Sequence, residues 1–369
     1  MKKKKAQLTL DSFLNLKHKR RQFFYIDWNE ENPKAQWLHS KPTNFTWTQV
    51  VKFKEIGDII ICCNTPLSIS EDDEIIKKIN DDKKTQDIPN KIISFLKSHL
   101  QKCIRRSMTE SAIKTAFALL CFNKEEFIRR LSIIAFEDVR AKVYYPNIIW
   151  LISAVSKGFA LNKKMVNYLL SIVVDLCEDK TADEISSSIP NERDITIAGH
   201  LDKVESCETI SEQGKSFLYS ILFRMSYGGM VWDIDMLGGY LLTWRERLKQ
   251  GVILLDFDYD KLKKLQNLCD YMKIKKIEEL TTEDFILEGV DFHCFPSILD
   301  DIIKESRVNY TKQELKDTIW EYNSKINFRK DNTVLEKKLE IIWSDIKCVL
   351  RKLQLTILED MVLLIKSYK

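Results

Sequence analysis

The stretch "AIKTAFALLCFNKEEFIRRLSIIAFEDV", Ala112 to Val139, decides the fold class of this chain. Its apolar residues return every three or four positions, which is the period of an amphipathic helix and not the period of two that a half-buried strand shows. The same period runs from residue 91 to residue 180, through segments such as "PNIIWLISAV" and "MVNYLLSIVVDLC". We therefore expect a mainly α-helical protein, with one helical subdomain over residues 91–180.

The rest of the chain is long enough for a second subdomain. It has 369 residues but only ten glycines and seven prolines, and so few helix-breaking residues favour long helices. We expect a multi-helix globular body in two subdomains, laid out as follows: a disordered basic tail over 1–22, an extended aromatic segment and charged linker over 23–90, the first helical subdomain over 91–180, a linker over 181–211 and the second helical subdomain over 212–369.

Two local patterns lead to more specific expectations. Thr46 and Thr48 precede apolar residues at helical spacing as far as Ile60, which predicts a capped helix there. The run "GVILLDFDYD", residues 251–260, is the best strand candidate in the second half of the chain.

The positive charge of the chain is concentrated at its N-terminus. Residues 1–21 hold eight Lys and Arg side chains against one Asp, a charge of +7, so the remainder must carry −3 to give the overall +4. Such tails are typically solvated and contact polyanions, and two separated basic clusters resemble a bipartite nuclear-import signal. We expect the nucleus, or an intracellular site of viral DNA replication, as the location. The basic residues are Lys2, Lys3, Lys4, Lys5, Lys17, Lys19, Arg20 and Arg21.

Between the two basic clusters lies the octet "QLTLDSFL", Gln7 to Leu14. Leu10, Phe13 and Leu14 fall at i, i+3 and i+4, so one helical turn presents all three as an apolar plug, while Gln7 offers an amide upstream. The octet resembles the PIP box, the peptide by which proteins bind the sliding clamp PCNA. The family prefers two aromatic residues at the end of the motif, whereas here the second is Leu14, which fills less of the groove.

The resemblance implies a non-catalytic accessory or adaptor protein of DNA replication or repair, with a PCNA-type clamp as partner and DNA as a possible contact of the basic tail. An alternative from another class is that the octet starts an amphipathic helix that docks on residues 91–180 of the same chain. The protein is then a structural interaction module with no clamp binding.

The segment "EEFIRRLSIIAFEDV", residues 125–139, resembles the helical region that follows the ATPase core in replication-associated recombination ATPases. Those enzymes hold nucleotide with a Gly-rich loop ending in Gly-Lys-Ser/Thr, and this chain has no such loop. The resemblance therefore implies only a scaffolding module. A simpler interpretation is an ion-pair network that ties two helices together, formed by Arg129, Arg130, Glu137 and Asp138.

A metal-dependent nuclease is the alternative with catalytic chemistry, because nucleases place several carboxylates around divalent cations. The candidate carboxylates are Asp233, Asp235, Asp256, Asp258, Asp260 and Asp291, the last beside His293 and Cys294. Acidic turns and helix caps explain these clusters more simply, so we predict no catalytic residue, no metal ligand and no cofactor.

The nine cysteines are spread widely and form no Cys-x-x-Cys pair, which favours free thiols in a reducing compartment. No apolar run approaches the length of a membrane span, and we expect no membrane partner.

Overall fold

The computed structural model describes residues 21–53, 57–65, 74–81, 88–186, 196–256, 277–292, 295–306, 309–330 and 337–368. It is mainly helical, with 63% helix and 8% strand, and this confirms the expectation of a mainly α-helical protein. In the described part of the chain, no helix is long and apolar enough to cross a membrane.

The chain forms two compact units, and each unit is assembled from three separate stretches. Unit 1 comprises Met1–Ile69, Lys142–Gly158 and Glu184–Phe257. Unit 2 comprises Ser70–Ala141, Phe159–Asp183 and Asp258–Lys369. The sequence led us to expect contiguous subdomains, but these units alternate along the chain.

Unit 1 contains a four-stranded sheet in the order β2-β1-β4-β3. The strands are β1 (Phe23–Asp27), β2 (Gln36–Leu38), β3 (Trp47–Phe53) and β4 (Gly57–Asn64). β1 runs antiparallel to β2 and parallel to β4, and β3 runs antiparallel to β4. The aromatic segment that was expected to be extended thus supplies two paired strands, β1 and β2.

The helix expected to begin at Thr46 or Thr48 is wrong, because these residues lead into the antiparallel pair of β3 and β4. β4 has a neighbour on each side, and a strand buried in this way reads as a continuous apolar run, here "IIICC". Such a run can match a helical period by accident. Gly57 opens β4 with a φ of +84°, a conformation that glycine adopts without steric cost.

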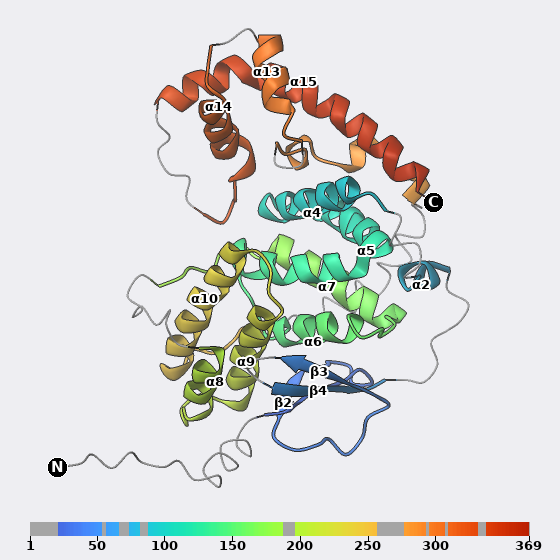
Figure 1. The fold of residues 1–369 in the computed structure, drawn as a ribbon, viewed down its shortest axis with the longest axis vertical. Helices are drawn as coiled ribbons and strands as arrows, with labels where there is room; N and C mark the ends of the chain where they lie inside the picture. Colours follow the sequence, from blue (N-terminus) through green and yellow to red (C-terminus); the bar gives the residue numbers. More distant parts are fainter. Residues whose placement is uncertain are drawn as a thin grey trace, which may run out of the picture. The chain divides into compact units, whose positions relative to one another are not determined.

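Four described helices belong to unit 1: α6 (Tyr145–Val155), α8 (Ile197–Glu205), α9 (Glu212–Ser226) and α10 (Val231–Lys249). α6 packs on β1 and β4, and α9 packs on β2 (Figure 1). The buried Trp150 of α6 donates its indole N–H to the carbonyl oxygens of Phe24 and Cys62, at 3.1 and 3.2 Å. This side chain therefore joins the helix to the two central strands.

The strand predicted over residues 251–260 is wrong where the structure describes it, since residues 251–256 form no strand. Leu254 is buried, and the Leu255 carbonyl accepts a hydrogen bond from the Val143 N–H at 3.2 Å. Burial of Leu254, and not a β ladder, accounts for part of the apolar character of this run.

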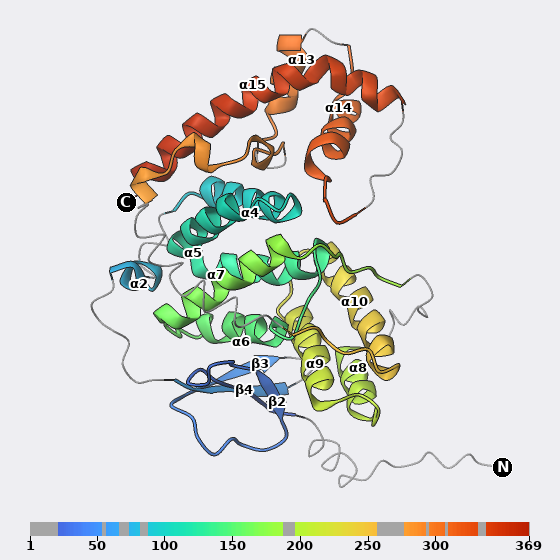
Figure 2. The same cartoon turned by 180° about the vertical axis from the view of Figure 1, so that it is seen from behind.

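Unit 2 is built on helices α4 (Asn90–Arg105), α5 (Thr109–Glu137) and α7 (Lys163–Glu178), which pack on one another (Figure 2). α5 contains one non-helical residue, Asn123, with φ −161° and ψ 90°. Its side-chain oxygen accepts from the Glu126 N–H at 3.0 Å and so caps the second half of the helix. This break separates the two apolar faces that the sequence indicated within Ala112 to Val139.

The remaining described elements of unit 2 are shorter, except for the last: α2 (Glu74–Ile79), the 3₁₀ turns η1 (Ile277–Glu279), η2 (Thr282–Asp284) and η3 (Leu287–Gly289), α13 (Ile298–Ser306), α14 (Lys312–Ile319), the π-helical turn η4 (Trp320–Ser324) and α15 (Lys337–Ser367). α13 and α14 pack on α15 around a cluster of buried aliphatic residues that includes Ile302, Leu315 and Ile346. One apolar stripe of α15 is thereby buried.

Candidate functional site

The residues with the strongest functional signal lie outside the described part of the chain. These are Gln7, Leu10, Phe13 and Leu14 of the octet and the basic residues Lys2, Lys3, Lys4, Lys5, Lys17, Lys19 and Arg20. The described chain begins at Arg21, the last member of the basic cluster.

Arg21 does not behave as an exposed tail residue. It is only 4% exposed, and its guanidinium lies 3.1 Å from Glu205 and 2.7 Å from Glu212. Nη1 also donates to the Trp37 carbonyl at 2.9 Å. Burial by itself lowers the pKa of Arg21, but the hydrogen bonds to Glu212 and Glu205 outweigh it and raise the pKa. The expectation that Arg21 contacts a polyanion is therefore corrected: its charge is satisfied inside unit 1.

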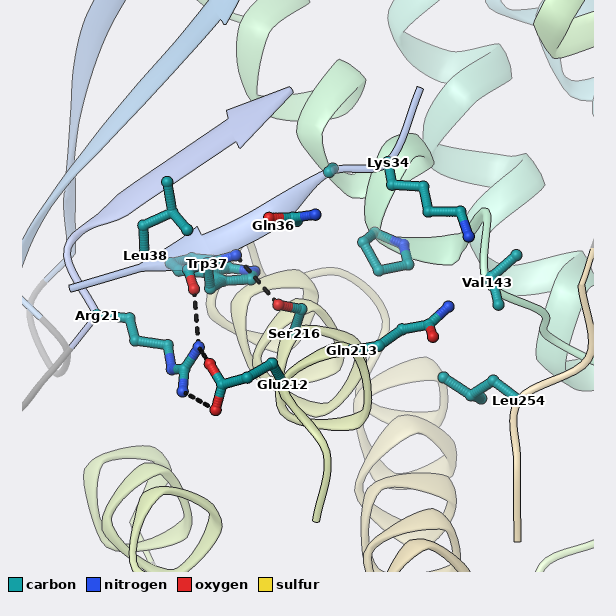
Figure 3. A pocket seen from close by; sticks show the side chains of 12 residues that line it. Arg21, Lys34, Gln36, Trp37, Leu38, Val143, Glu212, Gln213, Ser216 and Leu254 are labelled. Carbon is teal, nitrogen blue, oxygen red and sulfur yellow. Dashed lines mark hydrogen bonds and ion pairs between the residues drawn. The ribbon is translucent and has the colours of Figure 1, made fainter. Parts of the chain in front are cut away.

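A cavity of about 280 Å³ opens beside this ion pair (Figure 3). One wall comes from β2 and the residues just before it, including Lys34 and Gln36, and the other from the first turns of α9, including Glu212 and Gln213. Leu254 and other apolar residues complete the lining. Figure 3 shows the Lys34 and Gln213 side chains extending toward each other from the two walls.

The polar groups that line the cavity include the Lys34 ammonium and the side-chain amides of Gln36 and Gln213. Among the described residues that line it, Glu212 is the only one with a carboxylate. Arg21 holds this carboxylate, and its hydrogen bond is the main cause of the lowered pKa of Glu212. The Trp37 N–H donates to Ser216 Oγ at 3.2 Å, and its carbonyl accepts from Arg21. These two bonds occupy the outward-facing backbone groups of Trp37, so a peptide strand has no free partner at this position of β2.

The candidate nuclease carboxylates do not share one environment where they are described. Asp233 and Asp235 lie in the first turns of α10, where an i, i+2 spacing turns them to different faces. Asp256, also in unit 1, lies 3.6 Å from the ammonium of Lys34. Asp258, Asp260, His293 and Cys294 lie outside the described residues.

Asp291 belongs to unit 2 and is 4% exposed. It pairs with the Lys102 ammonium and accepts from the Ser324 hydroxyl at 2.9 Å. Its charge is therefore already compensated. The described residues contain no group of three or more His, Cys, Asp or Glu side chains placed to hold a metal ion.

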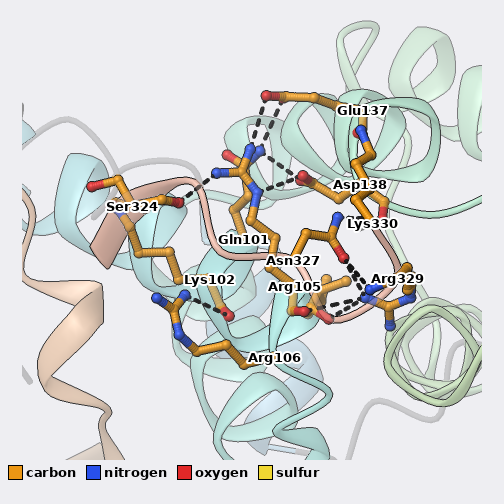
Figure 4. Close-up of polar contacts among 12 residues, drawn as sticks. Gln101, Lys102, Arg105, Arg106, Glu137, Asp138, Ser324, Asn327, Arg329 and Lys330 are labelled. Atoms are coloured by element: carbon orange, nitrogen blue, oxygen red, sulfur yellow. Dashed lines mark hydrogen bonds and ion pairs between the residues drawn. The ribbon is translucent and has the colours of Figure 1, made fainter. Parts of the chain in front are cut away.

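An ion-pair network does tie two helices of unit 2 together, with a different main cation from the one expected (Figure 4). Glu137 and Asp138, both expected members, pair with Arg105 at the end of α4. Gln101 donates to the same two carboxylates at 2.9 and 2.6 Å. Arg130 joins indirectly, by donating to the Gln101 side-chain oxygen.

Arg329, a residue that the sequence did not single out, extends the same polar cluster. Its guanidinium donates to the carbonyls of Leu176 and Asp179 at the end of α7, both at 2.6 Å, and to that of Ile104 in α4 at 2.8 Å. Cations at helix C-termini satisfy carbonyls that lack an intrahelical partner. Arg329 thus joins the ends of two helices, a structural role that no local sequence pattern signals.

Comparisons of the chain with models of known protein families, with curated proteins and with solved structures find no match. The case for a function therefore rests on the residues themselves.

Proposed function

We propose that this chain is a non-catalytic accessory protein of DNA replication or repair, recruited to a PCNA-type sliding clamp by its N-terminal octet. The observation that carries the proposal is the spacing of Gln7, Leu10, Phe13 and Leu14. A single helical turn brings the three apolar side chains to one side, which is how short helical peptides anchor in apolar grooves.

Charge supports the same proposal. The octet lies between Lys2–Lys5 and a second basic cluster from Lys17 to Arg21. The resemblance to the PIP box implies a partner clamp with an acidic surface. Opposite charges raise the rate at which the two surfaces meet, and the effect falls as salt screens it. The two basic clusters also resemble a nuclear-import signal. Import by such a signal brings the chain to nuclear DNA, where sliding clamps act.

The position of Arg21 adds a geometric argument. Leu14 precedes Arg21 by seven residues, so the octet ends within about 25 Å of that anchor even if the intervening chain is fully extended. A tether this short keeps unit 1 beside whatever surface the octet binds.

Two buried carboxylates of the body, one of them the nuclease candidate Asp291, are engaged in ion pairs. Asp138 pairs with Arg105 and Asp291 pairs with Lys102, so both charges stabilise the fold. A catalytic carboxylate instead needs access to substrate or to a metal ion.

Isothermal titration calorimetry of the full chain against recombinant PCNA tests the proposal. Phe13→Ala removes the aromatic anchor, and a hot-spot aromatic is worth about 2 kcal/mol or more, so we expect affinity to fall by about thirtyfold. Leu8→Ala is the matched control, because Leu8 lies in the octet but off the i, i+3, i+4 face. Equal binding by wild type and Phe13→Ala, or no binding by wild type, would refute the proposal. A peptide of residues 1–21 shows whether the octet suffices.

A further inference from the structure

The solvent face of α15 carries a second regular stripe, in addition to the buried stripe that packs on α13 and α14. Its members follow one another at intervals of three or four residues, the spacing of a coiled-coil seam. They are Ile341, Asp345, Cys348, Lys352, Leu355, Glu359, Leu363 and Lys366. All are exposed except the half-buried Lys366.

The apolar side chains of this stripe have large solvent-exposed fractions. Within the stretch paired below, Leu355 is 44% exposed and Leu363 67%, and the thiol of Cys348 is free and exposed. In the described part of the chain, these apolar side chains of the stripe therefore stay largely exposed to solvent. Covering such side chains with a partner removes apolar surface from water, which favours association.

The charged residues of the same face are self-complementary about the point between Leu355 and Thr356. Residues equally distant from this point would face each other if a second α15 lay antiparallel to the first. The opposed pairs are Lys352 with Glu359, Arg351 with Asp360, Asp345 with Lys366 and Cys348 with Leu363. No exposed position of α15 opposes a residue of like charge in this alignment.

We propose that this face is the interface of an antiparallel homodimer. A two-fold axis through the point between Leu355 and Thr356 makes each pair occur twice, as an interface formed by the same surface on both subunits requires. The overlap from Ser344 to Ser367 is about 36 Å long and buries on the order of 1,000 Å², near the lower limit for a specific interface. The charges along α15 are complementary to those of a second, antiparallel α15. This complementarity, more than the apolar area, identifies a second copy of this chain as the partner.

Contacts among the described residues leave the face available. Lys352 lies 3.7 Å from Glu305 of α13, and both side chains are exposed, so water weakens this pair. Asp345 accepts from the Tyr310 hydroxyl at 2.7 Å and retains further lone pairs for a cation. The homodimer does not depend on the function proposed above.

Sedimentation velocity of the full chain, from nanomolar to high micromolar concentration, tests the dimer. Arg351→Glu with Lys352→Glu reverses four interchain pairs by symmetry, and we expect the dissociation constant to rise by at least about tenfold. Adding Glu359→Lys and Asp360→Lys to the same chain restores every pair with opposite sign and should restore the dimer. These surface substitutions do not touch the core. The proposal would be overturned if the wild type is monomeric. It would also be overturned if the charge-reversed double variant dimerises with the same dissociation constant as the wild type.

A disulfide test determines the orientation. In the antiparallel pair Leu363→Cys lies opposite Cys348 of the second copy, so mild oxidation should link the chains, and the same chain with Cys348→Ser should stay unlinked. The two Cys348 residues then lie about 22 Å apart along the axis, beyond the reach of a disulfide. A Cys348 to Cys348 link in the wild-type chain would instead show a parallel pair and overturn the proposal.

Discussion

Unit 2 should lose stability in mild acid because of the buried His99. Its ring is fully buried, Nδ1 lies 2.8 Å from Thr115 Oγ1, and Nε2 accepts the Ile286 N–H at 2.8 Å. Since Nε2 accepts, the ring proton is on Nδ1 and the imidazole is neutral. Burial, with smaller contributions from the charges of Lys102 and Arg106, lowers the pKa of His99 from 6.5 to about 3.

The sign of the effect follows from linkage. The folded state binds the proton more weakly than the unfolded state, so His99 contributes stability that is complete above pH 6.5 and is lost as the pH falls toward about 3. Between pH 7 and pH 5 the unfolded imidazole becomes charged while the folded one stays neutral. The contribution of His99 to the free energy of unfolding therefore falls by about 2 kcal/mol over this interval, a value that hardly changes if the folded pKa is a unit higher.

The assay is urea unfolding at pH 7 and pH 5, combined with hydrogen exchange at the Ile286 amide. His99→Gln can keep both hydrogen bonds but does not titrate, so we expect a pH-dependent loss about 2 kcal/mol smaller than in the wild type. His39→Gln, at an exposed histidine of unit 1, is the control and should keep the wild-type slope at Ile286. The same pH slope in wild type and His99→Gln would refute the assignment of this acid sensitivity to His99.

Gly289→Ala and Arg105→Met, each compared with one further variant, test the packing and the ion pairs of unit 2. Gly289→Ala would place a methyl carbon 2.1 Å from the ring of His99, so we expect a loss of about 1–3 kcal/mol in urea unfolding. Gly238→Ala, whose nearest neighbour atom would be 3.6 Å away, should cost far less, and equal losses would contradict the steric argument. Arg105→Met leaves Asp138 buried without its cation and should cost about 3–5 kcal/mol by the same assay. Adding Asp138→Asn should recover part of that loss, and a double variant that recovers none would argue against a charge effect.

The helical class was accessible from sequence because its signal is local. Apolar residues return with the helical period through Ala112 to Val139, and the break at Asn123 separates two faces already visible in the pattern. The octet from Gln7 to Leu14 is also a local signal, since a single turn of chain carries its whole chemistry. It remains a prediction from sequence alone, because these residues lie outside the described structure.

The sheet could not be predicted in the same way. The run "IIICC" in β4 satisfies either period, and its strand character depends on pairing with β1, more than thirty residues earlier in the chain, as in the register of Tyr25 with Cys62. Pairing between distant segments depends on the tertiary fold, and a short apolar run does not carry that information.

The sequence by itself determined the helical class, the asymmetric charge and the spacing of the N-terminal motif, because each depends on residues a few positions apart. Only the tertiary structure decided that Arg21 is buried between Glu205 and Glu212 and that Arg105 is the cation for Asp138. Buried charges must find partners in three dimensions, since leaving one unpaired costs several kcal/mol. Those partners can come from any part of the chain that folding brings close, so sequence spacing does not identify them.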